Sequence, residues 1–433
     1  MPPAAHLESI GRAVQGEIYR RGALGRRPAI PVGSDALERA ARRRMSAAAW
    51  AYVAGSAGRF DTAAANRAAF NAWEIVPRVL RDISTRDMGI ELFGRRLPTP
   101  LLLAPLGALD LVRREADLQI AAAAASLDVP MLISSQGSAP MERTAAALGS
   151  APRWFQLYWS SSDELTESFV RRAEKTGAEA IVVTLDTQML GWRTADLELG
   201  SLPFVRGLGI AQYTSDPVFA ELVRERAAKT GERRAGQRTR PAPGAVRTLL
   251  TLARSHPGPI LANLRSPLPR AAVETFLELF SRPSLTWTDL AWLRQRTRLP
   301  ILLKGILDPR DAALAVEHGV DGIIVSNHGG RQIDGEVAAL SVLPEVVAAV
   351  GERLPVLFDS GIRGGADVFK ALALGARAVG IGRPVAYGLA MSGSAGVIGV
   401  LRHLLAELDI TMTLSGCCSV DEIASHLLRP ASR

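Results

Sequence analysis

Eight short β-rich runs recur along the chain, and each of them ends in small or polar residues. Most are continuous stretches of Val, Ile and Leu, as expected for parallel strands that are buried on both faces. Helix-forming stretches lie between them, and several end in glycine, a common helix stop. Such an alternation predicts an α/β fold of the (β/α)8, or TIM, barrel type. The runs are residues 100–107, 129–135, 153–159, 178–186, 300–306, 322–327, 355–361 and 378–383.

A doubly wound open sheet is the main alternative fold. Such a sheet normally carries a glycine-rich dinucleotide-binding turn after its first strand. The first run here reads LLLAPLGALD and contains no G-x-G-x-x-G. We therefore expect a single barrel domain over residues 1–433, with the barrel itself at 96–390.

Three segments fall outside the strand–helix repeat. Residues 1–95 contain helical patterns such as DALERAARRRMSAAAWAYVAG and are predicted to be an N-terminal helical extension, and residues 391–433 are predicted to form C-terminal helices. Residues 197–250 form a long insertion after the fourth strand, on the side where barrel enzymes do their chemistry. Connections of this length are usually functional. We interpret the insertion as a lid, with an idle disordered loop as the alternative.

Composition narrows the class of protein. The 433 residues are 48% hydrophobic, enough for a sizeable core. No apolar run approaches the ~20 residues that span a bilayer, and the N-terminus lacks the order of a secretory signal. Cys417 and Cys418 are adjacent, which suits neither a disulfide framework nor a zinc site. We expect a cytoplasmic protein without stable membrane insertion and without a metal.

The formal net charge of +8 allows several kinds of partner. The arginines are scattered, and no zinc-finger or RNA-reading motif accompanies them. Nucleic acid is therefore not expected as a partner. Part of the positive charge is interpreted as serving an anionic substrate and a phosphate-bearing cofactor.

Polar or small residues stand at the carboxyl end of almost every predicted strand. In a barrel these ends converge on one pocket. Burying so many polar groups costs free energy unless they are paired, so a bound polar ligand is the better explanation. The residues are Gly107, Ser134, Gln156 with Tyr158, Thr184, Lys304, Ser326 with His328, Asp359, and Gly382 with Arg383.

The last two strands indicate a phosphate site. The loops after strands seven and eight of such barrels often bind phosphate through backbone N–H groups and a helix N-terminus. Here they read DSGIRGGAD and GIGRP. Each adds an arginine, Arg363 and Arg383, suited to bidentate phosphate contact.

The segment SNHGGRQ (326–332) follows the sixth strand. His328 can exchange a proton near neutral pH, and Arg331 offers a planar fork for a carboxylate. A histidine held in the core or at a helix cap is the alternative. Asp186 either orients the imidazole or caps a helix. Lys304 is either a cation beside a ligand or a side chain that extends to solvent.

Together these motifs resemble the FMN-dependent L-2-hydroxy acid oxidising family, which includes glycolate oxidase, lactate oxidase, mandelate dehydrogenase and lactate 2-monooxygenase. SNHGGRQ, LFDSGIRGGADVFKALALGA and IGRP carry most of the specificity, and the match spans about residues 45–425. FQLYW, TLDTQMLGWR and GIAQYTSDPVF look closest to lactate 2-monooxygenase. The resemblance implies FMN as cofactor, an L-2-hydroxy acid and dioxygen as substrates, and a homotetramer or homo-octamer.

The resemblance also implies a role for each matched residue. His328 would remove the hydroxyl proton, or the α-proton in the rival mechanism, with Asp186 in support. Arg331 and Arg193 would hold the substrate carboxylate, with Tyr52 and Tyr158 at the oxygen atoms of the substrate, and Lys304 would lie by the flavin N1/C2 carbonyl. The remaining FMN contacts would be Gly107, Ser134, Gln156, Thr184, Ser326, Asp359, Gly361, Arg363, Gly382 and Arg383.

Three positions depart from the family pattern. Gln136 stands where glycolate oxidases carry Trp, so the pocket for the substrate side chain is expected to be more polar and open to a larger or more hydrophilic substrate than lactate. Gly107 stands where lactate oxidase usually has Ala, which leaves more room near the ring. Ser56 stands where Gly is usual.

Several functions remain alternatives. A dehydrogenase of the same family could dock its basic insertion on a membrane and reduce quinone, although the insertion lacks a strong apolar face. A biosynthetic oxidase could act on a larger polar 2-hydroxy acid. A phosphate-binding barrel isomerase or a non-catalytic binding protein need not combine His328, Arg331 and Arg193. Whether the product decarboxylates depends on its retention under residues 197–250.

Overall fold

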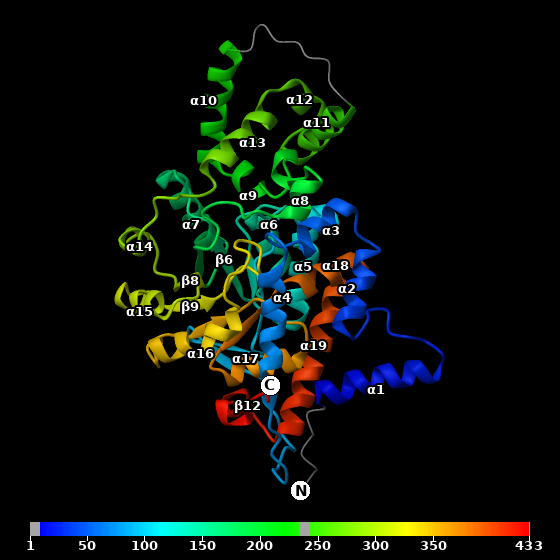
Figure 1. The fold of residues 1–433 in the computed structure, drawn as a ribbon. Helices are drawn as coiled ribbons and strands as arrows, with labels where there is room; N and C mark the ends of the chain where they lie inside the picture. The colour runs from blue at the N-terminus through cyan, green and yellow to red at the C-terminus, as the bar shows by residue number, and fades with distance from the viewer. Residues whose placement is uncertain (1–8, 234–242, 433) are drawn as a thin grey trace.

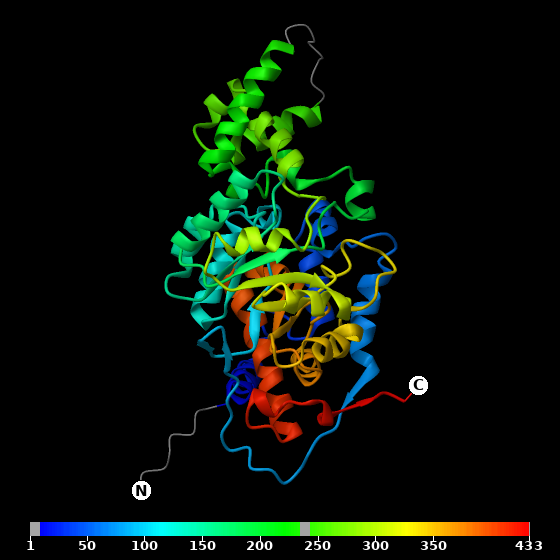
Figure 2. The same cartoon turned by 90° about the vertical axis from the view of Figure 1, so that its left-hand side faces the viewer.

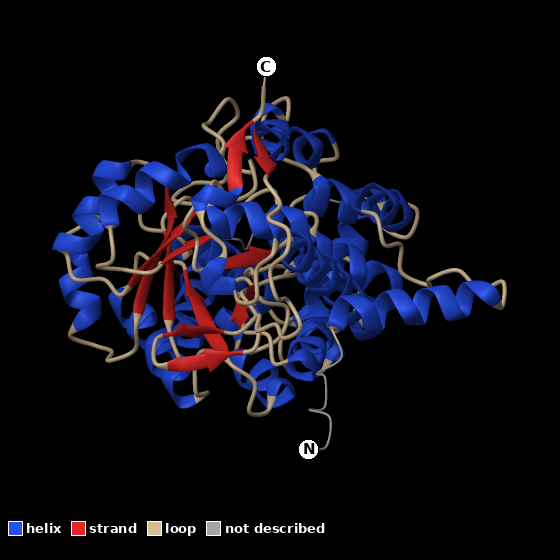
Figure 3. Cartoon of the chain, turned by 90° about the horizontal axis from the view of Figure 1, so that it is seen from below, coloured by secondary structure: helices blue, strands red, loops and turns tan. Residues whose placement is uncertain are grey.

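A closed barrel of eight parallel strands forms the centre of the chain in the computed structural model, which describes residues 9–233 and 243–432. Figure 3 shows these strands surrounded by helices. The barrel is closed between its first and last strands, where Val379 pairs with Leu101. The predicted (β/α)8 fold is confirmed, with one strand inside each predicted run. The strands are β4 (Leu101–Leu103), β5 (Met131–Ile133), β6 (Arg153–Leu157), β7 (Ile181–Thr184), β8 (Ile301–Ile306), β9 (Gly322–Val325), β10 (Val356–Phe358) and β11 (Ala378–Ile381).

The strands are continuous apolar runs because both of their faces are covered. Every residue of β4, β5, β7, β9 and β10 is buried. Outer helices cover the barrel, and side-chain caps start several of them: the Ser162 hydroxyl accepts from the backbone N–H of Leu165 at the start of α7. These helices are α5 (Ala116–Leu127), α6 (Met141–Leu148), α7 (Asp163–Lys175), α14 (Asp289–Arg294), α15 (Pro309–Glu317), α16 (Ala339–Val350), α17 (Gly365–Ala373) and α18 (Arg383–Ser392).

The two chain ends contain strands as well as the predicted helices. Helices α1 (Ile10–Ala23), α2 (Ser34–Arg42), α3 (Ala47–Ala54) and α4 (Asp61–Ala68) precede the barrel, and α19 (Ser394–Ser415) follows it. β1 (Trp73–Ile75) pairs with β12 (Leu428–Pro430) from the opposite end of the chain, and β2 (Ile90–Leu92) pairs with β3 (Arg95–Leu97). The purely helical prediction for residues 1–95 and 391–433 therefore misses these strands. Residues 1–8 and 433 lie outside the described residues.

The insertion after β7 is a helical unit that continues past residue 250. It projects from the barrel in Figures 1 and 2, and edge-to-face aromatic packing, such as Tyr213 against Phe276 at 4.8 Å, forms its core. The described part of the insertion is therefore helical and is not the disordered loop that was the alternative. Residues 234–242 of the predicted range lie outside the described residues. The helices are α8 (Thr194–Glu198), α9 (Ala211–Thr214), α10 (Pro217–Arg233), α11 (Pro243–Ser255), α12 (Ile260–Arg265) and α13 (Leu268–Leu279).

Two glycines set the distance between α18 and α19. A Cβ atom added to Gly396 would collide with the backbone of Gly388. We expect Gly396→Ala to destabilise the protein by about 1–3 kcal/mol, because the two packed helices would have to separate. Thermal unfolding measures the effect. Gly22→Ala in α1, where an added Cβ meets nothing within 4 Å, is the control, and equal melting temperatures for the two variants would contradict this account of the packing.

Candidate active site

A cavity opens at the carboxyl ends of the barrel strands. Its position is typical of ligand sites in TIM barrels. All of the predicted site residues except Thr184, Asp186 and Ser326 line it, and those three contact residues that do. The predicted residues in the lining are Tyr52, Gly107, Ser134, Gln136, Gln156, Tyr158, Arg193, Lys304, His328, Arg331, Asp359, Gly361, Arg363, Gly382 and Arg383.

The His328 imidazole is held by Asp186. The Nδ1 atom of His328 lies 2.7 Å from Asp186 Oδ1, and the backbone N–H of His328 donates to Ser326 Oγ at 3.1 Å. With Nδ1 bonded to the carboxylate, Nε2 is the nitrogen left for a ligand. His328 also has φ of 55°, a left-handed conformation that non-glycine residues adopt mainly where function demands it.

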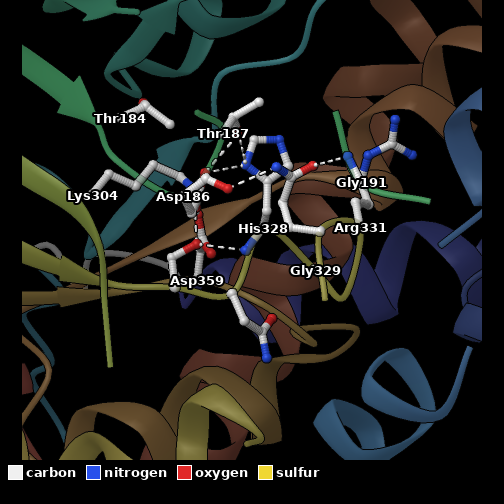
Figure 4. A network of polar contacts seen from close by, with 12 residues as sticks. Thr184, Asp186, Thr187, Gly191, Lys304, His328, Gly329, Arg331 and Asp359 are labelled. Carbon is white, nitrogen blue, oxygen red and sulfur yellow. Dashed lines mark hydrogen bonds and ion pairs between the residues drawn. The ribbon is translucent and has the colours of Figure 1, made fainter. Parts of the chain in front are cut away.

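Asp186 also binds Lys304, so a single buried carboxylate contacts two basic side chains (Figure 4). Lys304 Nζ lies 3.2 Å from Asp186 Oδ2 and 3.5 Å from Asp359 Oδ2, and it donates to Ser326 Oγ at 2.8 Å. The Thr187 hydroxyl donates at 2.9 Å to Asp186 Oδ1, the same oxygen that His328 contacts. Asp186 is therefore a positioning residue and not a helix cap, and Lys304 is buried instead of extending to solvent.

The burial and charges of this cluster fix its protonation. Burial raises the pKa of Asp186, but His328 and Lys304 outweigh it and the net shift is downward. Burial lowers the pKa of Lys304, yet Asp186 and Asp359 bring it above its usual range. Burial lowers the pKa of His328 more than Asp186 raises it. At neutral pH the cluster is thus a carboxylate, an ammonium and a neutral imidazole.

Arg331 and Arg193 form a second group of cations in the lining of the cavity. The Arg331 guanidinium donates to the backbone oxygens of Tyr52 and Gly55 and stands 5.0 Å from the centre of the Tyr52 ring. Arg193 donates to the backbone oxygen of Arg331 at 3.2 Å. Burial, with the charge of Arg193, lowers the pKa of Arg331 to about 9, so it remains a cation at neutral pH. Neither arginine forms an ion pair within the described ranges, so a carboxylate is the natural ligand here.

Two tyrosines add neutral hydroxyl donors to the lining. Tyr52 and Tyr158 are buried, and burial raises the pKa of both, that of Tyr158 to about 12. Both phenols therefore keep their protons at neutral pH and can donate to an oxygen atom of a ligand.

A buried chain of hydrogen bonds crosses three neighbouring strand ends. The Ser134 hydroxyl donates to Gln156 Oε1 at 2.9 Å, and Gln156 Nε2 donates to Thr184 Oγ1 at 3.0 Å. This network orients the amide of Gln156 at the wall of the cavity.

Two further arginines, Arg363 and Arg383, line the cavity after β10 and β11, and Arg383 shares the backbone oxygen of Gly55 with Arg331. Burial lowers the pKa of Arg363 and Arg383, that of Arg383 to about 10, and each guanidinium repels the other. Arg383 donates to backbone oxygens of Val53, Gly55 and Gly329 and to the Ser56 hydroxyl. No carboxylate pairs with either guanidinium in the part of the chain that is described, and a Cβ on Gly382 would meet only open space. An anion between the two would remove their repulsion.

Sequence reasoning missed some residues of the site. Thr187 and Leu190 line the cavity from the start of the insertion, and Ser360 lines it after β10. Ser360 Oγ donates to Asp359 and accepts from the backbone N–H of Gly329. Ser360 lies inside the DSGIRGGAD motif and could have been selected there, whereas Thr187 and Leu190 follow a strand end without a distinguishing pattern.

The family model for FMN-dependent dehydrogenase matches residues 41–430. The chain belongs to this family. It is 40% identical, over 96% of each chain, to an FMN-dependent alpha-hydroxy acid dehydrogenase of Penicillium citrinum, and 39% identical to an L-lactate oxidase of Lysinibacillus sphaericus over 92% of this chain and 93% of the relative. A solved mandelate oxidase with (S)-4-hydroxymandelic acid superposes with a TM-score of 0.75 at 35% identity, covering 93% of this chain and 99% of that one.

FMN is the cofactor of this family, and the cavity fits it. The unpaired guanidiniums of Arg363 and Arg383 suit its phosphate, and the open space at Gly382 admits a ligand close to the backbone. The Ser134–Gln156–Thr184 chain offers amide and hydroxyl groups to a polar ring edge, and Lys304 supplies a buried cation. The described part of the chain contains no helix long and apolar enough to cross a membrane.

Arg363 allows the phosphate site to be tested separately. We expect Arg363→Met to weaken FMN binding by about 10- to 100-fold, because one charge-assisted contact to the phosphate is lost. Titration of the apoprotein with FMN, followed by flavin fluorescence, measures the dissociation constant. Arg310→Met, which removes an exposed guanidinium that pairs with Asp308, is the matched control, and equal affinity in the two variants would remove Arg363 from the site.

Proposed function

We propose that this chain oxidises an L-2-hydroxy acid to the corresponding 2-keto acid, with FMN as the first electron acceptor and dioxygen as the second. The observation that carries the proposal is one cavity that combines the His328–Asp186 pair with two unpaired arginines, Arg331 and Arg193. A base and a carboxylate site on the same cavity match the two functional groups of a 2-hydroxy acid. An isomerase or a binding protein does not require this combination.

His328 is the proposed base. Its neutral imidazole can accept a proton at Nε2 while Nδ1 stays bonded to Asp186. The negative charge of Asp186 then stabilises the imidazolium that results. Whether the first proton leaves from the hydroxyl oxygen or from Cα, His328 is the acceptor in this scheme.

Arg331 and Arg193 bind the substrate carboxylate in the proposal, and Tyr52 and Tyr158 donate to oxygen atoms of the substrate. The arginines are held by backbone oxygens, so their positions do not depend on the ligand. Such preorganisation fixes Cα and the hydroxyl group relative to His328. FMN, when bound, accepts the two electrons that leave Cα. Lys304, held by Asp186 and Asp359, keeps a positive charge in the cavity where negative charge develops.

Dioxygen is favoured as the second acceptor by the relatives named L-lactate oxidase. A quinone-reducing dehydrogenase remains the second candidate, since other relatives are named dehydrogenases.

Oxidative decarboxylation, as in lactate 2-monooxygenase, would require the keto acid to stay in the cavity. The start of the insertion supports this possibility, because Leu190 and Arg193 line the cavity and Phe204 packs edge-on against Tyr52. A lid function for residues 197–250, a cytoplasmic location and a homotetramer or homo-octamer stay predictions.

Anaerobic mixing with L-2-hydroxy acids tests the proposed function. The yellow flavin of the wild-type protein should bleach with at least one of them, and readmitted dioxygen should restore the colour. Persistent bleaching in dioxygen followed by recovery with a quinone would favour the dehydrogenase. Analysis of the aerobic products separates keto acid and peroxide from a decarboxylated acid. A flavin that no 2-hydroxy acid reduces would overturn the proposal.

His328→Gln should slow this flavin reduction by about 100- to 10,000-fold, the usual contribution of a positioned general base. FMN should stay bound, because its phosphate is assigned to Arg363 and Arg383 and not to His328. Stopped-flow absorbance measures the rate, and the flavin spectrum reports occupancy. His426→Gln, at an exposed histidine outside the cavity, is the control. A colourless His328→Gln protein would contradict this separation of roles.

The pH dependence follows from the direction of the His328 shift. The base must be neutral, and burial lowers its pKa below 6.5, so the reduction rate should be constant from that pH up to about 9, where Arg331 loses its charge, and should fall on the acidic side. Since Asp186 raises the pKa of His328, Asp186→Asn should move the acidic limb to still lower pH and reduce the plateau by at least about 100-fold. An acidic limb that stays in place in Asp186→Asn would exclude the coupling.

A further inference from the structure

The Gln136 side chain is buried in the cavity without a partner. It is 7% exposed, and its Nε2 atom has no hydrogen bond. No described residue bonds to its Oε1 atom either. Buried amides nearly always have partners, because leaving one unpaired costs free energy. The Nε2 atom is closed to a molecule the size of water, so a ligand in the cavity would bond to Oε1.

The backbone of Gln136, in contrast, is bonded on both sides. Its N–H donates to Ser134 Oγ at 3.1 Å, and its carbonyl oxygen accepts from the N–H of Ala108 at 2.9 Å. Gly107 and Gly209 pack against the same residue, and a Cβ on Gly107 would come within 2.9 Å of Gln136 Cβ. The side chain is therefore held in place by its neighbours, and its amide is preorganised for a ligand and not turned toward a protein partner.

The bonds already assigned do not use this amide. The ring-edge network runs through Ser134, Gln156 and Thr184, and the substrate carboxylate is assigned to Arg193 and Arg331. Apolar side chains, Leu106, Leu109 and Leu190, line the cavity as well. Gln136 thus adds a neutral polar group to a lining that is otherwise suited to an aliphatic substrate chain.

We infer that Gln136 recognises an uncharged hydroxyl group on the side chain of the substrate, so that the preferred substrate is an L-2-hydroxy acid with a second hydroxyl. This inference rests on the proposed function and specifies its substrate class. A hydroxyl group can donate to Oε1, the end of the amide that is open to the cavity. A second carboxylate would be buried against a neutral group, because Lys304 is already paired with Asp186 and Asp359.

Matched substrate pairs test the inference. L-lactate and L-glycerate differ by one hydroxyl, as do L-2-hydroxybutyrate and L-2,4-dihydroxybutyrate. In the wild-type protein we expect kcat/KM to be about 10- to 100-fold higher for the hydroxylated member of at least one pair, as for a buried hydrogen bond to an uncharged group. L-malate provides the carboxylate comparison and should be slower than that member.

Gln136→Leu should abolish this preference, so that the ratio of kcat/KM within the pair approaches one. The flavin spectrum verifies that the variant holds FMN. If the leucine variant does not fold, the ratio of kcat/KM is measured in Gln136→Met, whose side chain has a similar length and greater flexibility. Gln295→Leu makes the same substitution at an exposed position and should keep the wild-type ratio.

Each outcome decides between the inference and its rivals. Absence of a preference in the wild-type protein, or a preference that survives in the Gln136 variants, overturns the inference, and so does L-malate as the fastest substrate. If lactate and 2-hydroxybutyrate reduce the flavin but no hydroxylated member is favoured, the proposed function stands without this substrate class. If no 2-hydroxy acid reduces the flavin, the proposed function itself fails.

Discussion

The buried contact of Asp186 with both His328 and Lys304 is the interaction on which the rest of the site depends. A carboxylate in this position is stable only because two basic groups surround it, and both basic groups take their positions from the carboxylate. Three barrel strands, β7, β8 and β9, end at this point, so their parallel register determines the contact. The site is therefore as rigid as the barrel that carries it.

The cavity contains three groups of charged side chains, and they differ in whether positive and negative charges within the group neutralise each other. The Asp186 cluster compensates its charges internally, whereas Arg331 with Arg193 and Arg363 with Arg383 do not. An internally balanced cluster can exchange a proton without a ligand, and unbalanced cations call for anions. In the function that we propose, the substrate carboxylate would lie at Arg331 and Arg193, and the FMN phosphate at Arg363 and Arg383.

The insertion after β7 connects the fold to specificity. Its first residues, including Leu190 and Arg193, belong to the cavity wall, and Gly209 packs on the backbone of Gln136. The helices α10–α13 project away from the barrel, and Phe276 of α13 packs on Tyr213 of α9, which also contacts Phe169 of α7. The same segment thus supplies part of the cavity wall, including the arginine that we assign to the substrate carboxylate, and packs on the residue whose amide we assign to the substrate side chain.

The sequence by itself determined the barrel, because strands buried on both faces are mostly apolar, and such runs recur eight times between helix-forming stretches. It also determined which residues meet at the mouth of the barrel, since parallel strands place their carboxyl ends together, as for Lys304, His328 and Arg383. The sequence did not predict the β1–β12 pair, because Glu74 and Arg429 are more than 350 positions apart and no local pattern indicates their contact. Only the tertiary structure decided that Asp186 binds His328 and Lys304 and does not cap a helix. It likewise decided that Gln136 has no protein partner, because hydrogen bonding depends on the neighbours that folding brings together.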